Sequence, residues 1–178
     1  MATANTVSRM HAKPAVLGDT ATIGTTFTLF KTSADSAVPV KVYIPGTDRL
    51  RGKSFRVHAS GNVKTAVTTN VTVTLQYGTS GTPGSNTTVE ASTAVAVNTT
   101  DAPWSITGEF IVEDVLKTLR GSGTSQVAGT HAVFTTLDNA PTSVDPTDEG
   151  NAFVVGITFS VGDAGNKATL EDFHLEVM

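Results

Sequence analysis

The sequence predicts an all-β protein built as an antiparallel β-sandwich. Thr and Val occur 31 and 22 times in 178 residues, and both are β-branched residues that suit the pleated surface of a strand better than a helix. Apolar residues also recur at every second position over most of the chain, which is the period of a strand that buries one face. Repeated short strands separated by turns are typical of two sheets packed face to face, here in a jelly-roll-like arrangement.

The predicted strands follow one another along the whole chain. The clearest has Val71, Val73, Leu75 and Tyr77 on one face, with polar side chains between them. The same alternation predicts further strands at 23–30, 38–44, 55–59, 89–97, 104–112, 127–134, 153–161 and 169–177. Segments rich in Gly, Pro, Asn and Asp predict turns at 44–46, 59–62, 78–86, 98–103, 121–123 and 162–166. A weak helical pattern at 113–119 predicts at most one helical turn between two strands.

Length and pattern together indicate one β-sandwich domain at 21–178, preceded by an extended N-terminal arm at 1–20. The arm is polar, lacks alternation and carries Arg9, His11 and Lys13. Two placements of the arm stay open: on a neighbouring subunit, or as an edge strand of the domain's own sheet. The chain starts with polar residues, and its longest apolar run is far shorter than the roughly 20 residues of a membrane span. We therefore expect neither secretory export nor a membrane partner.

Charge is distributed unevenly along the chain. Residues 1–70 carry nine Lys or Arg and three Asp or Glu, and residues 71–178 carry three and thirteen, so +6 and −10 add up to the net −4. We predict that basic residues of the first part bind an acidic partner surface, namely Arg9, His11, Lys13, Arg49, Arg51 and Lys53. Mixing of the two charges over the surface of one domain is the alternative. The pI of about 5.5 argues against nucleic acid as the partner.

No residue pattern points to catalysis, a cofactor or a metal. The chain has no cysteine, which excludes thiolate chemistry. Segment 46–54 has five residues between its glycines, where a phosphate-binding loop has four, and a strand pattern follows it instead of a helix. His11, His58, His131 and His174 are too far apart in sequence to pair on one element, although strands can bring distant ones together. We therefore expect no enzyme, no cofactor and no catalytic or metal-binding residues.

Five segments carry a resemblance to a known class of proteins. They read GKSFRVHASG at 52–61, VTVTLQYGTS at 71–80, PWSI at 103–106, FVVGITF at 153–159 and GNKATLEDFHLE at 165–176. Over residues 50–178 the chain resembles jelly-roll structural proteins of tailed-bacteriophage virions, and within these most nearly the capsid decoration, or cement, proteins. The similarity lies in strand lengths and in richness in Thr, Val and Gly, so it assigns no functional residue.

This resemblance implies a non-enzymatic virion protein that decorates and stabilises a bacteriophage capsid by bridging neighbouring shell subunits. It implies a homotrimer on the outer capsid surface, made in the host cytoplasm, with the major capsid protein as partner. The alternative is a receptor- or carbohydrate-binding β-sandwich module of a phage tail fibre or cell-surface protein. Trp104 would be the natural sugar platform, but it shares a strand face with Ile106 and Phe110, so we expect it in the core.

Overall fold

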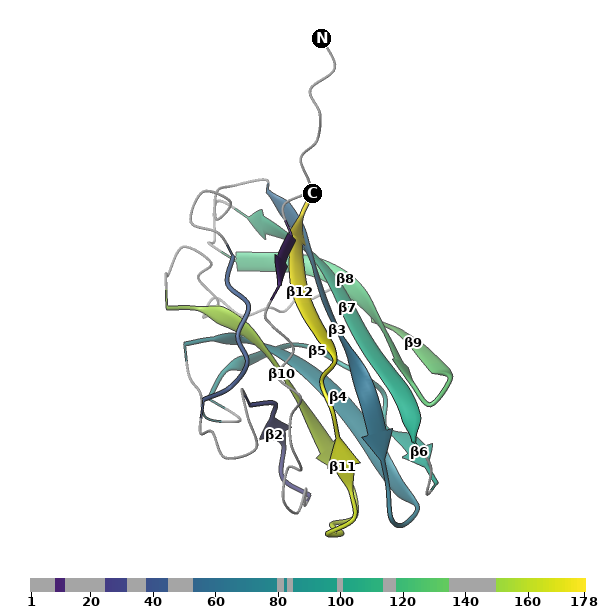
Figure 1. The fold of residues 1–178 in the computed structure, drawn as a ribbon. Coiled ribbons are helices and arrows are strands. Elements are labelled where there is room, and N and C mark those ends of the chain that lie inside the picture. The colour runs from purple at the N-terminus through teal and green to yellow at the C-terminus, as the bar shows by residue number, and fades with distance from the viewer. Residues whose placement is uncertain are drawn as a thin grey trace.

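The computed structural model describes residues 9–11, 25–31, 38–44, 53–79, 82, 85–98, 101–113, 118–134 and 150–178. Two antiparallel sheets pack face to face as a β-sandwich, which confirms the predicted fold class (Figure 1). Sheet A has the strand order β1-β12-β3-β7-β8-β9, with β11 also paired to β3. Sheet B has the order β2-β10-β4-β5, with β6 also paired to β4.

The strands of sheet A include the longest ones in the described chain. They are β1 (Arg9–His11), β3 (Ser54–Lys64), β7 (Ala102–Glu113), β8 (Thr118–Val127), β9 (Thr130–Phe134), β11 (Lys167–Ala168) and β12 (Asp172–Val177). Sheet B contains β2 (Thr28–Leu29), β4 (Thr69–Gly78), β5 (Thr87–Ala91), β6 (Val95–Val97) and β10 (Ala152–Phe159). The first long strand, β3, lies beside the last, β12, while β4 lies beside β10 in the other sheet. Early and late strands therefore pair in both sheets, as in a jelly roll.

The core lies between the two sheets and is built from the apolar faces that the alternation predicts. Val71, Val73 and Leu75 on β4 are fully buried. Phe153 on β10 has its ring centroid 4.6 Å from that of Tyr77, 5.5 Å from Phe110 and 5.9 Å from Phe55, so one ring joins aromatic residues of both sheets. Contacts of this kind fix the position of the sheets because aromatic rings pack with preferred geometries.

Trp104 lies in the core, as predicted. It is 1% exposed, and its ring stacks on Phe30 at a centroid distance of 5.3 Å. Its indole Nε1 donates a hydrogen bond to the backbone oxygen of Thr169 at 3.2 Å, so its one polar atom is also satisfied. A tryptophan in this position has no face available to a sugar.

Two of the predicted turns are wrong. Segments 59–62 and 121–123 lie inside β3 and β8 instead of between strands. A Cβ at Gly61 would overlap the backbone oxygen of Thr169, and a Cβ at Gly123 would overlap the carboxylate of Glu90. In both places glycine allows another part of the chain to approach the strand closely, which is a second use of glycine in sheets.

Five predicted strands also differ from the structure. The described part of 23–30 contains only the short strand β2, 89–97 is divided between β5 and β6, and in 169–177 the strand β12 begins at Asp172. The segment 127–134 is divided between β8 and β9 by a tight turn at Ala128 and Gly129. The segment 38–44 forms only isolated bridges, in which Pro39 pairs with Lys31 and Val42 pairs with Phe153. The alternation at 38–44 correctly indicates residues that are buried against sheet B. It does not show whether the backbone of this segment pairs with a strand, and only two bridges form among the described residues.

The turn between β8 and β9 suggests a stabilising substitution. Ala128 and Gly129 have φ of 49° and 82°, the pair of positive values that a type I′ turn requires. Because Asn tolerates this backbone region better than Ala, Ala128→Asn should raise the free energy of unfolding by about 0.5–1 kcal/mol. Urea unfolding measures this change, and the control is Ala96→Asn, at an exposed position of β6. Equal midpoints for Ala128→Asn and wild type would contradict this turn geometry.

Candidate interaction surface

The predicted contact residues are only partly covered by the described chain. Arg9 and His11 belong to β1, which pairs with β12 in the register Arg9↔Glu176 and His11↔His174. Lys53 directly precedes β3 and is exposed. Lys13, Arg49 and Arg51 lie outside the described residues. Of the two placements left open for the N-terminal segment, residues 9–11 take the second, an edge strand on their own sheet.

The outer face of sheet A carries a row of alternating charges, which we call the arginine–glutamate row. It runs across three neighbouring strands from Glu176 on β12 through Arg56 on β3 to Glu109 on β7. Arg56 Nε donates to Glu109 Oε1 at 2.9 Å, and Arg56 Nη1 lies 3.8 Å from Glu176 Oε2. Because the Arg56 and Glu109 side chains are 43% and 49% exposed, we expect the pair to contribute little to stability.

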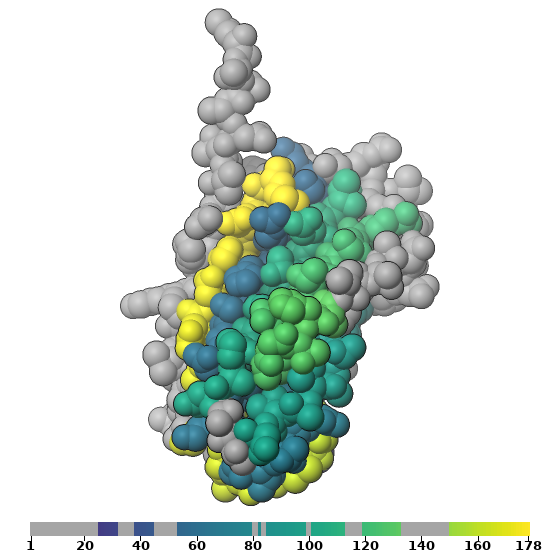
Figure 2. All heavy atoms as spheres, turned by 90° about the vertical axis from the view of Figure 1, so that its right-hand side faces the viewer, coloured from purple at the N-terminus to yellow at the C-terminus, as the bar shows by residue number. Residues whose placement is uncertain are grey.

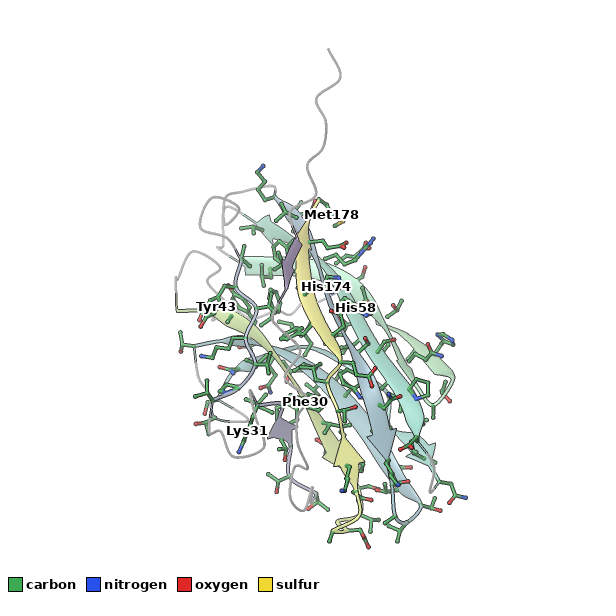
Figure 3. The ribbon with its side chains drawn as sticks, in the orientation of Figure 1. Phe30, Lys31, Tyr43, His58, His174 and Met178 are labelled. Atoms are coloured by element: carbon green, nitrogen blue, oxygen red, sulfur yellow. The ribbon has the colours of Figure 1, made fainter. Side chains whose placement is uncertain are left out.

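A second row on the same face consists of two histidines. His174 on β12 is directly opposite His58 on β3, and their ring centroids are 5.4 Å apart (Figure 3). His58 Nδ1 is hydrogen-bonded to Thr107 Oγ1 at 2.8 Å, and His174 Nδ1 lies 2.9 Å from Asp172 Oδ2. Partial burial, followed by the neighbouring His174, lowers the pKa of His58 below its ordinary value of 6.5, which favours the neutral imidazole at pH 7.

The two rows lie on the same outer face of sheet A. Figure 2 shows it from the outside, with β12 in yellow, β3 in blue and the following strands in teal and green, in the order of the sheet. Lys53 and Arg120 are exposed at the end of the sheet where β3 begins and β12 ends, and Ile111 between their strands is 41% exposed. This end combines positive charge with an apolar side chain, a combination found at protein interfaces.

One buried carboxyl group was missed by the sequence analysis. Glu90 on β5 is 5% exposed, and neither of its carboxylate oxygens has a hydrogen-bond partner among the described residues. Its carboxylate lies against Gly108 and Gly123, which are paired with each other on β7 and β8. Burial raises the pKa of Glu90 to about 8, so the group is largely protonated at pH 7.

Period-2 alternation could not reveal the position of Glu90. Val89 and Glu90 are consecutive and both buried, which a regular half-exposed strand does not allow. The register between β4 and β5 shifts between Leu75 and Gln76, and such a bulge changes which face the following residues take. The sequence gives only an indirect indication of this site. Gly108 and Gly123 lie within strands, where a glycine can mark the close approach of another part of the chain.

Two further features are absent from the described part of the chain. It contains no group of three or more His, Cys, Asp or Glu side chains arranged to hold a metal ion. Nor does it contain a helix long and apolar enough to cross a membrane.

Comparisons with known proteins give little guidance. No protein-family model matches the chain, and no curated protein is significantly similar to it. Among solved structures, it is similar to peanut lectin with a 9-residue peptide, at 10% identity and a TM-score of 0.40, over 100% of this chain and 94% of the lectin. This resemblance is too distant to bear on the function.

Proposed function

We propose that the protein is a non-enzymatic virion protein that decorates and stabilises a bacteriophage capsid by bridging neighbouring shell subunits. The observation that carries the proposal is the position of β1. This strand comes from the basic N-terminal segment and lies at the edge of sheet A, beside β12 and near the end where Lys53 is exposed. Basic residues distant in sequence thus lie near one corner of sheet A, where the edge strand β1 meets the end of the sheet that carries Lys53, and an acidic partner can bind there.

The architecture supports the same role. A large core of aromatic and aliphatic side chains holds two sheets together, as a protein that must resist unfolding on a particle requires. The edge strand β1 is three residues long and adds to β12 through backbone hydrogen bonds, a mode of attachment that also joins separate chains. We propose the major capsid protein and further copies of this chain, as a trimer, as the partners.

Charge reversal at the two ends of β3 tests the proposal. Lys53 and Lys64 are both exposed and lie about 35 Å apart, so one can be altered without affecting the other. We expect Lys53→Glu to weaken attachment to capsid shells of the encoding phage, purified without this protein, by about fivefold at low salt. Lys64→Glu should bind as tightly as the wild type does. A salt concentration of 0.5 M should weaken shell binding of the wild type and of both variants.

Co-sedimentation of full-length protein with the shells measures this attachment. Equal loss for Lys53→Glu and Lys64→Glu would show that only net charge matters and would remove the proposed edge. Absence of any binding to the shells would reject the capsid role itself. The mass of the free protein and its copy number per particle then report whether the bound form is a trimer.

The carbohydrate-binding alternative makes a different prediction. Trp104 is buried, and among the described residues Tyr43, 40% exposed, is the large aromatic side chain open to solvent (Figure 3). Sugar binding to proteins commonly uses such an exposed aromatic face, because it offers apolar area and a hydroxyl together. Binding to a glycan array that is lost in Tyr43→Ala, together with no binding to shells, would replace the capsid proposal with a sugar-binding module.

A further inference from the structure

We propose that His58 and His174 form a binding site for a divalent transition-metal ion of the Cu²⁺, Ni²⁺ or Zn²⁺ type on the outer face of sheet A. The two residues are 116 positions apart in the sequence and meet because β12 returns to pair with β3. The proposal concerns the ion-binding chemistry of this row and does not depend on attachment to a capsid.

The separation of the two rings fits a shared metal ion. Directly opposite residues of antiparallel strands have their side chains on the same face, with Cβ atoms about 5 Å apart. An ion about 2.1 Å from one nitrogen of each ring, at a tetrahedral angle, places the ring centroids about 5 Å apart. The observed centroid distance between His58 and His174 is 5.4 Å, which matches the separation expected for one shared ion.

One contact of each ring, at Nδ1, orients the imidazole. Asp172 Oδ2 lies 2.9 Å from His174 Nδ1, and since a carboxylate only accepts, Nδ1 of the neutral ring carries the proton. The lone pair is then on Nε2. A carboxylate on the other nitrogen is the usual second contact of a metal-bound histidine, because it orients the ring and increases its basicity.

His58 is oriented in a similar way. Its Nδ1 lies 2.8 Å from Thr107 Oγ1, and when Nδ1 is the donor of this hydrogen bond the lone pair of the neutral ring is on Nε2. Three strands therefore hold the pair: β12 with His174 and Asp172, β3 with His58, and β7 with Thr107. Ligands fixed by neighbouring strands lose less freedom on binding than ligands on a loop.

The surrounding charges also suit a cation. Glu176 Oε1 lies 3.7 Å from His174 Nε2, so a carboxylate oxygen stands on the side where the ion would bind. Asp172 adds a second negative charge, and Arg56, which lies 3.8 Å from Glu176 Oε2, partly opposes them. Since the described residues contain no complete set of three ligands, the proposed site is an open one, with water in the remaining positions.

Calorimetric titration with CuCl₂, NiCl₂ and ZnCl₂ tests the site on the untagged full chain at pH 7.5. We expect one ion per chain, with Cu²⁺ bound most tightly, as it is by most nitrogen ligands. His58→Asn and His174→Asn should each weaken Cu²⁺ binding at least tenfold. The matched control is His131→Asn, an exposed histidine of the same sheet on β9, which should change binding less than twofold.

Two readouts distinguish loss of the site from loss of the fold. Far-UV circular dichroism should be the same for all variants, and Cu²⁺ electron paramagnetic resonance should show two nitrogen ligands in wild type and one in His58→Asn. At a hundred times the dissociation constant, the ion should raise Tm of wild type by about 5–10 °C and leave that of the double variant unchanged. Binding by the His58→Asn/His174→Asn double variant as tight as wild type overturns the proposal, as does equal loss in His131→Asn.

Discussion

The Glu90→Gln variant should be more stable than wild type at pH 8 by about 3–5 kcal/mol and about equal to it near pH 4. The reason is the buried position of this carboxyl group, between Gly108 on β7 and Gly123 on β8. Its two oxygens have no hydrogen-bond partner in the described chain, and burial alone accounts for the raised pKa of about 8. Ionisation in this place is therefore costly, whereas an amide of similar shape stays neutral.

The direction of the pH dependence of stability follows from the number of protons bound in the folded and unfolded states. In the unfolded chain Glu90 loses its proton near the ordinary pKa of 4.5, and in the folded protein near 8. Between these values the folded state holds more protons, so the free energy of unfolding falls as pH rises. The contribution of Glu90 is fully present below pH 4.5 and is lost by about pH 8. No charged side chain from β4, β7 or β8 contributes to the raised pKa, for which burial is the one cause.

Urea unfolding at pH 4, 6 and 8 measures the effect. The matched control is Glu171→Gln, an exposed glutamate whose Oε1 accepts a hydrogen bond from Asn62 Nδ2, and its stability should follow wild type within about 0.5 kcal/mol. If the difference between Glu90→Gln and wild type is the same at all three pH values, Glu90 does not titrate inside the sandwich.

The Phe153→Ala variant should lose about 3–5 kcal/mol of stability, which corresponds to a fall in Tm of about 10 °C or more. Phe153 is fully buried near the start of β10 and contacts the rings of Tyr77, Phe110 and Phe55. Truncation leaves a cavity between the sheets and removes all three aromatic contacts, since no neighbouring side chain can fill a space of that size without moving a strand.

Thermal unfolding followed by circular dichroism tests this prediction. Phe153→Leu keeps most of the apolar volume, so its loss of stability should be less than half that of Phe153→Ala. Val38→Ala removes apolar atoms from a side chain that is 58% exposed and should change Tm little. A loss below 1 kcal/mol for Phe153→Ala would mean that the two sheets are not joined through this ring.

Local pattern was sufficient for much of the sandwich. Alternation located β4, β7 and β10 to within about three residues at each end, and it placed Trp104 in the core. The turn at 162–166 was predicted from its residue types, and in the structure Asp163 Oδ1 accepts a hydrogen bond from the backbone N of Gly165 at 2.7 Å. These features succeed because each depends on residues that are neighbours along the chain.

The local residue pattern predicts where strands form and which of their faces are apolar, because burial of one strand face depends on a local period of two. The order of the strands within each sheet depends instead on contacts between distant parts of the chain. In this order His58 lies opposite His174, β1 pairs with β12, and Gly61 lies next to the backbone of Thr169. The register shift between β4 and β5 also places the Glu90 side chain in the interior. Such pairings join residues tens to more than a hundred positions apart, and they are set by the combined packing of both sheets.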